Sequence, residues 1–130
     1  MLLETNGVRR AQGQRELGGS QCAQYAALQR ARALVGHAEL THAPLTGVIA
    51  GCASGTTAAE NLSRAAANPE AVIDAWMQSP SHRSNLLDPA LTKIGVGCVL
   101  DGKSMLCSQM FLGPRFVMLK NVTTRARALP

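Results

Sequence analysis

The stretch KIGVGCVLDGKSMLCSQMFL, residues 93–112, carries the clearest structural signal in the chain. Two apolar runs surround DGKS, a pattern typical of two strands joined by a tight turn. Gly102 and Lys103 suit a two-residue turn, with glycine at the first position of type II′. Counting outward from that turn places Cys98 opposite Cys107. The stretch therefore predicts a β-hairpin of defined register.

That register brings two cysteines within bonding reach. Cys98 and Cys107 fall on a non-hydrogen-bonded pair, where Cα atoms lie about 4.5 Å apart, a separation that a disulfide tolerates. The alternative is two buried free thiols. If the bridge forms, Cys22 and Cys52 are the remaining pair, and they would close a loop of about thirty residues. Two bridges would indicate an oxidising compartment, hence a secreted protein whose signal has been removed.

Composition and charge exclude several classes of function. The length of 130 residues fits one domain, and the apolar residues are mainly alanine and leucine, which favours closely packed helices. Four basic residues and no acidic ones lie in 115–130, so the excess positive charge belongs to the tail and nucleic-acid binding is disfavoured. No uncharged segment reads as a continuous apolar span, so the chain is predicted not to cross a membrane. Since no C-x-x-C pair occurs, a structural zinc site is also disfavoured.

Helix signals precede the hairpin. Ser20, Asn68 and Ser79 are expected N-caps, and prolines follow the last two directly. Residues 37–57 look irregular, which for a connection of that length favours a functional loop. A further strand is expected around 114–122, followed by a flexible tail. Helices before strands predict an α+β protein with an antiparallel sheet.

Four polar side chains are candidates for chemistry, and each has a plainer interpretation. His82 begins a short helix, where a neutral imidazole can bind a metal or act as a base, but it could equally be a surface histidine. His42 precedes Pro44 in the irregular loop, whereas His37 fits a histidine at a helix end. Glu60 lies beside an uncharged stretch where a carboxylate needs a partner, or is an ordinary exposed glutamate.

The order of these motifs is similar to a known family. ETNGVRRAQG, LTH, AENL, VIDAWMQSPSHRSNLLDPALTKIGVG and CSQMF resemble the CAP superfamily of cysteine-rich secretory proteins, antigen 5 and pathogenesis-related proteins, in its bacterial SCP-like branch. The resemblance covers residues 1 to about 113. It implies an α-β-α sandwich with a small antiparallel sheet between helices, a CAP domain over 1–114 and a basic extension over 115–130.

The resemblance also implies a cleft. By motif position its metal or catalytic candidates are His42, His82 and Glu60, and zinc is the expected cofactor. Gln109 and Ser79 are expected to line the cleft, and Arg83 and Asn85 to pin the short helix. Two positions depart from the family pattern: Ala59 stands where a glycine usually precedes the motif glutamate, and Ser79 where many members have a second glutamate.

Three functions follow from the resemblance. The first is a secreted binding module for a lipid or sterol-like molecule, or for an extracellular protein or cell-wall partner. The second is a metal-assisted, peptidase-like hydrolase that uses the same cleft, although the missing second carboxylate weakens it. The third is a structural cell-wall or virion-associated module. Catalysis therefore stays an open question at this level.

Overall fold

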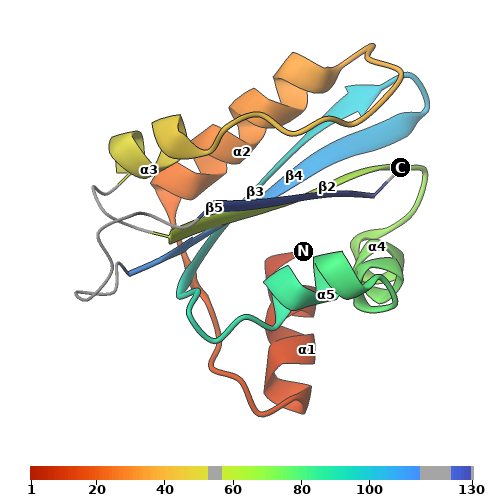
Figure 1. Cartoon of the computed structure of the whole chain (residues 1–130). Coiled ribbons are helices and arrows are strands. Elements are labelled where there is room, and N and C mark those ends of the chain that lie inside the picture. Colours follow the sequence, from red (N-terminus) through yellow and green to blue (C-terminus); the bar gives the residue numbers. More distant parts are fainter. Residues whose placement is uncertain (53–56, 115–123, 130) are drawn as a thin grey trace.

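The computed structural model describes residues 1–52, 57–114 and 124–129. Helices cover both faces of one sheet, with α2 and α3 on one side and α1, α4 and α5 on the other (Figure 1). This is the predicted α+β sandwich. In the described part of the chain the helices are α1 (Leu2–Ala11), α2 (Gln21–Leu34), α3 (Thr46–Cys52), α4 (Pro69–Met77) and α5 (Pro80–Leu86).

The sheet has five strands in the order β1-β3-β4-β2-β5. Its three central strands are antiparallel, as expected, whereas both outer strands run parallel to their neighbours. Because a parallel neighbour needs a crossover connection, local sequence gives little signal for it. The strands are β1 (Gly18–Gly19), β2 (Thr57–Ala65), β3 (Lys93–Asp101), β4 (Ser104–Gly113) and β5 (Thr124–Leu129).

The hairpin forms in the predicted register. Asp101 pairs with Ser104 and Cys98 with Cys107, and Gly102 has a φ of 65°, as the turn requires. The Cys98–Cys107 disulfide joins Cα atoms 4.1 Å apart. A second disulfide joins Cys22 and Cys52, 30 residues apart in sequence. Both expected bridges are therefore present.

Small residues set how closely α2 lies on the sheet. Ala23, Ala27 and Ala31 are fully buried along one stripe of the helix. Gly95 and Gly97 of β3 face them, and a Cβ on Gly97 would lie 2.3 Å from the backbone nitrogen of Leu28. Any side chain there would collide with the helix backbone. The alanine-rich composition is therefore what permits this helix–sheet contact.

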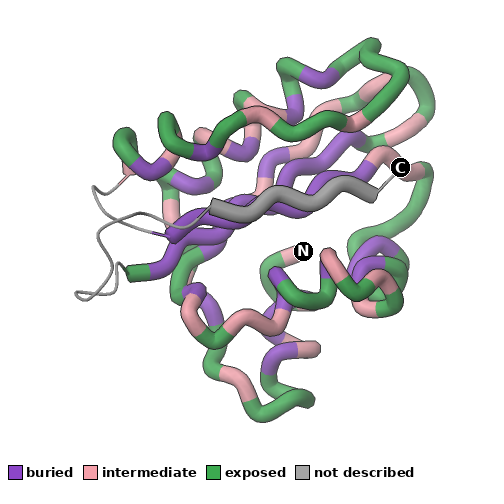
Figure 2. Tube along the Cα trace, viewed as in Figure 1, coloured by how far each residue is buried: buried purple, intermediate pink, exposed green. Residues whose placement is uncertain are grey.

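The opposite helix layer holds the larger apolar side chains. Trp76 of α4, Leu86 of α5 and Phe111 of β4 are fully buried in one cluster, to which Ile73 and Ile94 also belong. Figure 2 shows the buried residues where the helices meet the sheet and the exposed residues on the outer sides of the helices. None of the described helices is long and apolar enough to cross a membrane.

Three segments differ from the sequence prediction. The expected irregular loop, 37–57, contains the helix α3. The residues around Glu60 form β2, which lies between β4 and β5. The strand expected around 114–122 falls almost wholly outside the described residues. Within the expected flexible tail, the structure has β5, whose backbone pairs with β2 from Ala58 to Ser63. Pairing with a distant strand, rather than local propensity, determines these elements.

Candidate functional site

Glu60 is the centre of a charged cluster on the α2 side of the sheet. Its carboxylate is fully buried, and Oε2 accepts hydrogen bonds from Arg30 Nε at 3.1 Å and Ser108 Oγ at 3.0 Å. Its other oxygen, Oε1, lies 3.8 Å from Nδ1 of His42. A buried carboxylate needs such partners, because desolvation otherwise disfavours its charge. The structure thus brings Glu60 and His42 together, as expected.

Arg30 is a member of this cluster that the sequence prediction missed. It lies on the α2 stripe three residues after Ala27 and four before Leu34, both of which are buried. An arginine at an otherwise apolar stripe position was the available signal. Its Nη2 also donates to the backbone oxygen of Thr41 at 2.9 Å. Arg30 therefore holds the segment that carries His42 against the helix.

His82 belongs to the other face of the sheet. The side chain is buried, and its ring stacks on Trp76 with centroids 5.9 Å apart and planes inclined by 8°. Its Nδ1 is 2.7 Å from Ser79 Oγ. Ser79 is the residue before α5, as predicted, but its hydroxyl bonds this imidazole and makes no hydrogen bond to the helix backbone. The serine–proline start of α5 thereby orients the ring.

Strand alternation explains why His82 and Glu60 are separated. The Glu60 carboxylate contacts α2, while the next side chain, Asn61, donates to the backbone oxygen of His82 on α5. Successive side chains of a strand point to opposite faces. His82 and the Glu60 carboxylate consequently lie in different layers of the sandwich.

Gln109 and Asn85 are structural residues. Gln109 is fully buried; its Nε2 donates to Thr5 Oγ1 at 2.7 Å, and its Oε1 accepts from Asn61 at 3.3 Å. Asn85 donates to the side chain of Asn61 at 3.0 Å and to the Glu60 backbone oxygen at 3.3 Å. Gln109 has no exposed surface with which to line a cleft. Asn85 pins α5 to β2 as expected, while the Arg83 side chain is exposed.

His37 fits its plainer interpretation. It is exposed just after α2, and its backbone N–H donates to Leu34 at 3.0 Å. Its backbone oxygen accepts a hydrogen bond from Arg64, which also donates to Leu34 and pairs with Asp101 at 3.0 Å. His37 therefore contributes its backbone to the helix end, and its side chain has no place in the Glu60 cluster.

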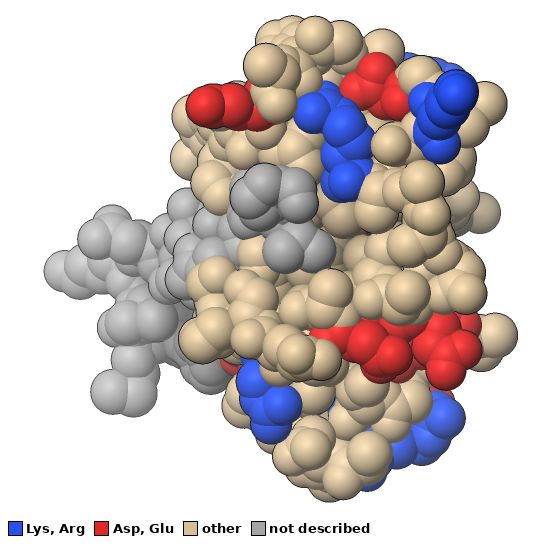
Figure 3. All heavy atoms as spheres, turned by 90° about the vertical axis from the view of Figure 1, so that its right-hand side faces the viewer, with Lys and Arg blue, Asp and Glu red and all other residues tan. Residues whose placement is uncertain are grey.

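Charge is distributed over the surface in separate groups. Glu4 of α1 and Glu70 and Asp74 of α4 line one cavity. On the face in Figure 3, acidic side chains form a group in the lower half and smaller groups near the top. Basic side chains on that face are spread over several places. The Glu4 pKa is lowered, chiefly by a hydrogen bond from the N-terminal ammonium group, whose nitrogen lies 2.7 Å away. No continuous basic surface is seen on this face.

An apolar groove lies between α2 and α3, next to the charged cluster. It has a volume of about 470 Å³ and is lined from α2 by Tyr25, Ala26 and Arg30 and from the α3 side by Pro44 and Val48. The Cys22–Cys52 bridge forms part of its wall. Arg30 thus touches both the groove and Glu60. The sequence prediction missed this groove because α3 was not expected.

The comparisons with known proteins agree with this architecture. The model of the cysteine-rich secretory protein (CAP) family matches residues 2–111, nearly the whole described chain. The chain belongs to this family. An uncharacterized protein of Bacillus subtilis, YkwD, is 46% identical over 57 residues, which cover 44% of this chain and 21% of that protein.

Solved structures show the same CAP fold. A cysteine-rich secretory protein from Staphylococcus aureus matches with a TM-score of 0.73 and 25% identity, over 86% of this chain and 36% of the other. An extracellular SCP-domain protein from Bacillus anthracis matches with a TM-score of 0.68 and 25% identity, over 84% and 37%. An outer surface protein of Borrelia burgdorferi has a TM-score of 0.76 and 20% identity, over 88% and 90%, which shows the fold alone.

The geometry does not fit the zinc site that the CAP resemblance implies. Glu60 Oε2 is already bonded to a guanidinium, whose charge opposes a second cation, and His82 lies in the other layer. Among residues 1–52, 57–114 and 124–129, no group of three His, Cys, Asp or Glu side chains is arranged to hold a metal ion. The predicted set of His42, His82 and Glu60 therefore does not share one pocket. No step of a reaction can be derived through such a metal.

Proposed function

We propose that this CAP domain is a secreted binding module that holds a small apolar ligand in the groove between α2 and α3. The groove carries the proposal: its volume of about 470 Å³ lies within the range of small-molecule sites, which are mostly apolar with few polar groups. Tyr25, which is 66% exposed, lines this groove, and Gln29 and Arg30 supply polar groups. A lipid or sterol-like molecule has this chemistry.

Secretion is supported by two observations. Both cysteine pairs are bridged, and disulfides persist mainly in oxidising compartments. Two structures with the same fold are described as an extracellular protein and an outer surface protein. The chain spans about a third of the extracellular Bacillus anthracis protein and about a fifth of YkwD. The proposal therefore concerns the CAP domain and not the activity of such a longer protein.

A hydrolase has less support from the geometry. Ser108, the hydroxyl beside Glu60, is fully buried and donates to the carboxylate, so it cannot reach a substrate as it stands. A nucleophile needs a base and access to the reacting carbonyl. The Glu60 cluster is better explained as the support that positions Arg30 at the groove.

The test is direct measurement of ligand binding. Protein purified natively should be extracted with organic solvent, and the extract examined by mass spectrometry for a lipid or sterol in stoichiometric amount. The delipidated protein should then be titrated with a fluorescent fatty acid and a fluorescent sterol. Absence of binding to both probes, together with an empty extract, would contradict the proposal.

A matched pair of substitutions places the ligand. Gly47 in α3 lines the groove and has open space beyond its Cα, so Gly47→Trp should fill the groove without a backbone collision. Gly7 in α1 has equally open space on the other side of the sheet, and Gly7→Trp is the control. We expect probe affinity to fall at least tenfold in the first variant and to stay unchanged in the second. Equal affinities would place the ligand elsewhere.

A further inference from the structure

The two disulfides differ in how far a reagent can approach them. Cys22 is exposed and Cys52 is half-buried, whereas Cys107 is 3% exposed in the sheet and Cys98 is half-buried. Attack on a disulfide requires a thiolate to reach one of the sulfur atoms. Access therefore favours reaction at the Cys22–Cys52 bridge.

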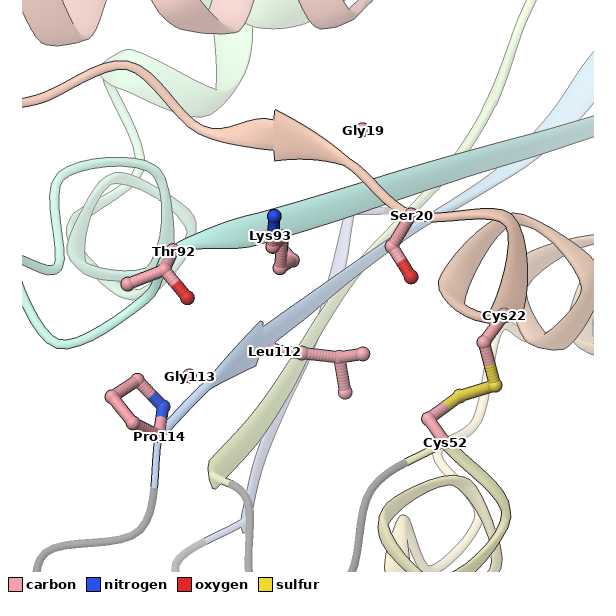
Figure 4. A pocket seen from close by; sticks show the side chains of 9 residues that line it. All are labelled: Gly19, Ser20, Cys22, Cys52, Thr92, Lys93, Leu112, Gly113 and Pro114. Carbon is pink, nitrogen blue, oxygen red and sulfur yellow. A yellow bond between two sulfur atoms is a disulfide. The ribbon is translucent and has the colours of Figure 1, made fainter.

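The accessible bridge also separates two cavities. One is the groove between α2 and α3; the other, of about 390 Å³, lies at the end of the sheet beside Ser20, Thr92 and Lys93. Figure 4 shows the sulfur–sulfur bond at the side of this second cavity, linking the start of α2 to the end of α3. A small thiol can thus reach the bridge from either cavity.

The surroundings favour Cys22 as the sulfur that leaves. Cys22 is the second residue of the 14-residue helix α2, and Ser20 is its N-cap. Backbone N–H groups at a helix N-terminus stabilise an adjacent thiolate.

From access and position together, we propose that Cys22–Cys52 is a thiol–disulfide exchange site for low-molecular-weight thiols. The external thiolate reaches Cys52 through either of the two cavities that this residue lines and attacks its Sγ. The Cys22–Cys52 bond breaks, and its electron pair leaves on Cys22 as a thiolate. A second external thiolate then attacks the mixed disulfide on Cys52. The products are a reduced cysteine pair and one oxidised disulfide of the reagent.

Opening of the bridge loosens one wall of the groove. In the described chain, Ile49 is the buried residue of α3, and Leu45 just before it is also buried, so the start of the helix stays anchored. Cys52 is the last residue of α3, and the bridge fixes that end to α2. Reduction should therefore release the last turn of α3 and lower ligand affinity; the effect on affinity rests on the proposed function.

A reduction titration tests the exchange site on the wild-type protein. The protein is incubated with increasing reduced glutathione at pH 8, trapped with iodoacetamide and mapped by peptide mass spectrometry. Alkylation of Cys22 and Cys52 is expected at glutathione concentrations at least tenfold below those that open Cys98–Cys107. Simultaneous opening of both bridges, or earlier opening of Cys98–Cys107, would overturn the proposal.

A second measurement tests the consequence for α3. In C22S/C52S, backbone hydrogen exchange over residues 46–52 should accelerate at least tenfold more than exchange in β3 and β4, which reports the global loss of stability. C98A/C107A is the control, in which exchange over residues 46–52 should accelerate no more than exchange in β3 and β4. In C22S/C52S, acceleration in α3 no greater than in β3 and β4 would refute the release. If glutathione opens Cys22–Cys52 first and α3 loosens while no probe binds the wild type, the exchange site stands and the proposed function fails.

Discussion

At the scale of single residues, Arg9 joins α1 both to the loop that follows it and to a segment far away in sequence, around the end of α5. The residue is 1% exposed, and its guanidinium donates to the backbone oxygens of Arg15 at 2.7 Å and Leu86 at 2.8 Å, and also to those of Asp88 and Leu91. Burial lowers the Arg9 pKa, because desolvation disfavours the charged form. The four backbone oxygens offset that cost, so the side chain fixes α1 to the end of α5.

Replacement of Arg9 should therefore be costly. In Arg9→Lys the charge is kept, but an ammonium group cannot reproduce the planar fork that bonds several oxygens. We expect a loss of about 2–4 kcal/mol in unfolding free energy, measured by urea denaturation. The control is Arg10→Lys, since Arg10 is exposed and pairs only at the surface with Glu16; it should change stability by less than about 0.5 kcal/mol. Equal effects would contradict the role given to Arg9.

The Glu60 cluster gives a second prediction at this scale. Because Arg30 already neutralises Glu60, and His82 lies across the sheet, removing either histidine should not change zinc affinity. Calorimetric titration of wild type, His42→Ala and His82→Ala with zinc should give the same result within error. A tenfold loss of affinity in both variants would show that the two imidazoles do hold a metal together.

At the scale of elements, the contact between α2 and β3 depends on the absence of side chains. A Cβ on Gly95 would lie 2.0 Å from the backbone nitrogen of Gln24, and Gly97 has a similar conflict with Leu28. Ala23 and Ala27 supply the opposing small surface. A side chain on Gly95 or Gly97 would collide with backbone atoms of α2, which cannot rotate aside as a flexible side chain can. The whole helix would have to move to make room.

Gly97→Ala should consequently destabilise the protein by at least about 1–3 kcal/mol, the usual range for overpacking. Gly7→Ala is the matched control, because nothing lies within 4 Å of its added Cβ and α1 should gain up to about 1 kcal/mol from the better helix former. Chemical denaturation of the two variants should give changes of opposite sign. A neutral Gly97→Ala would show that α2 can shift freely.

At the scale of the whole molecule, the bridges constrain the unfolded chain unequally. Cys22–Cys52 spans 30 residues and Cys98–Cys107 spans 9. On the chain-entropy model these loops correspond to about 3–4 and about 2–3 kcal/mol. The longer loop includes most of α2 and α3, the two elements that form the groove. The larger contribution thus comes from the more accessible bridge.

Removal of each bridge should lower Tm by different amounts. For a domain of this size, 1 kcal/mol shifts Tm by about 3–5 °C. We expect C22S/C52S to lower Tm by about 10–15 °C in calorimetry and C98A/C107A to lower it by a few degrees less. Full reduction of the wild type should lower it at least as much as C22S/C52S alone. An unchanged Tm on reduction would contradict the stabilising role of both bridges.

The sequence by itself determined what depends on neighbouring residues. The register of the β3–β4 hairpin, the Cys98–Cys107 pair and the N-caps Ser20 and Asn68 all follow from short-range patterns, since turn and cap geometry involve only a few consecutive residues. The motif order was likewise enough to identify the CAP fold.

Only the tertiary structure decided which side chains meet. Glu60 and His82 were expected in one cleft, but β2 places its successive side chains in opposite layers, and that alternation became visible only once the segment was a strand paired with β4. Arg30 reached Glu60 because α2 packs across the sheet. Such contacts join residues tens of positions apart, and their geometry is set by packing of whole elements, which no local pattern encodes.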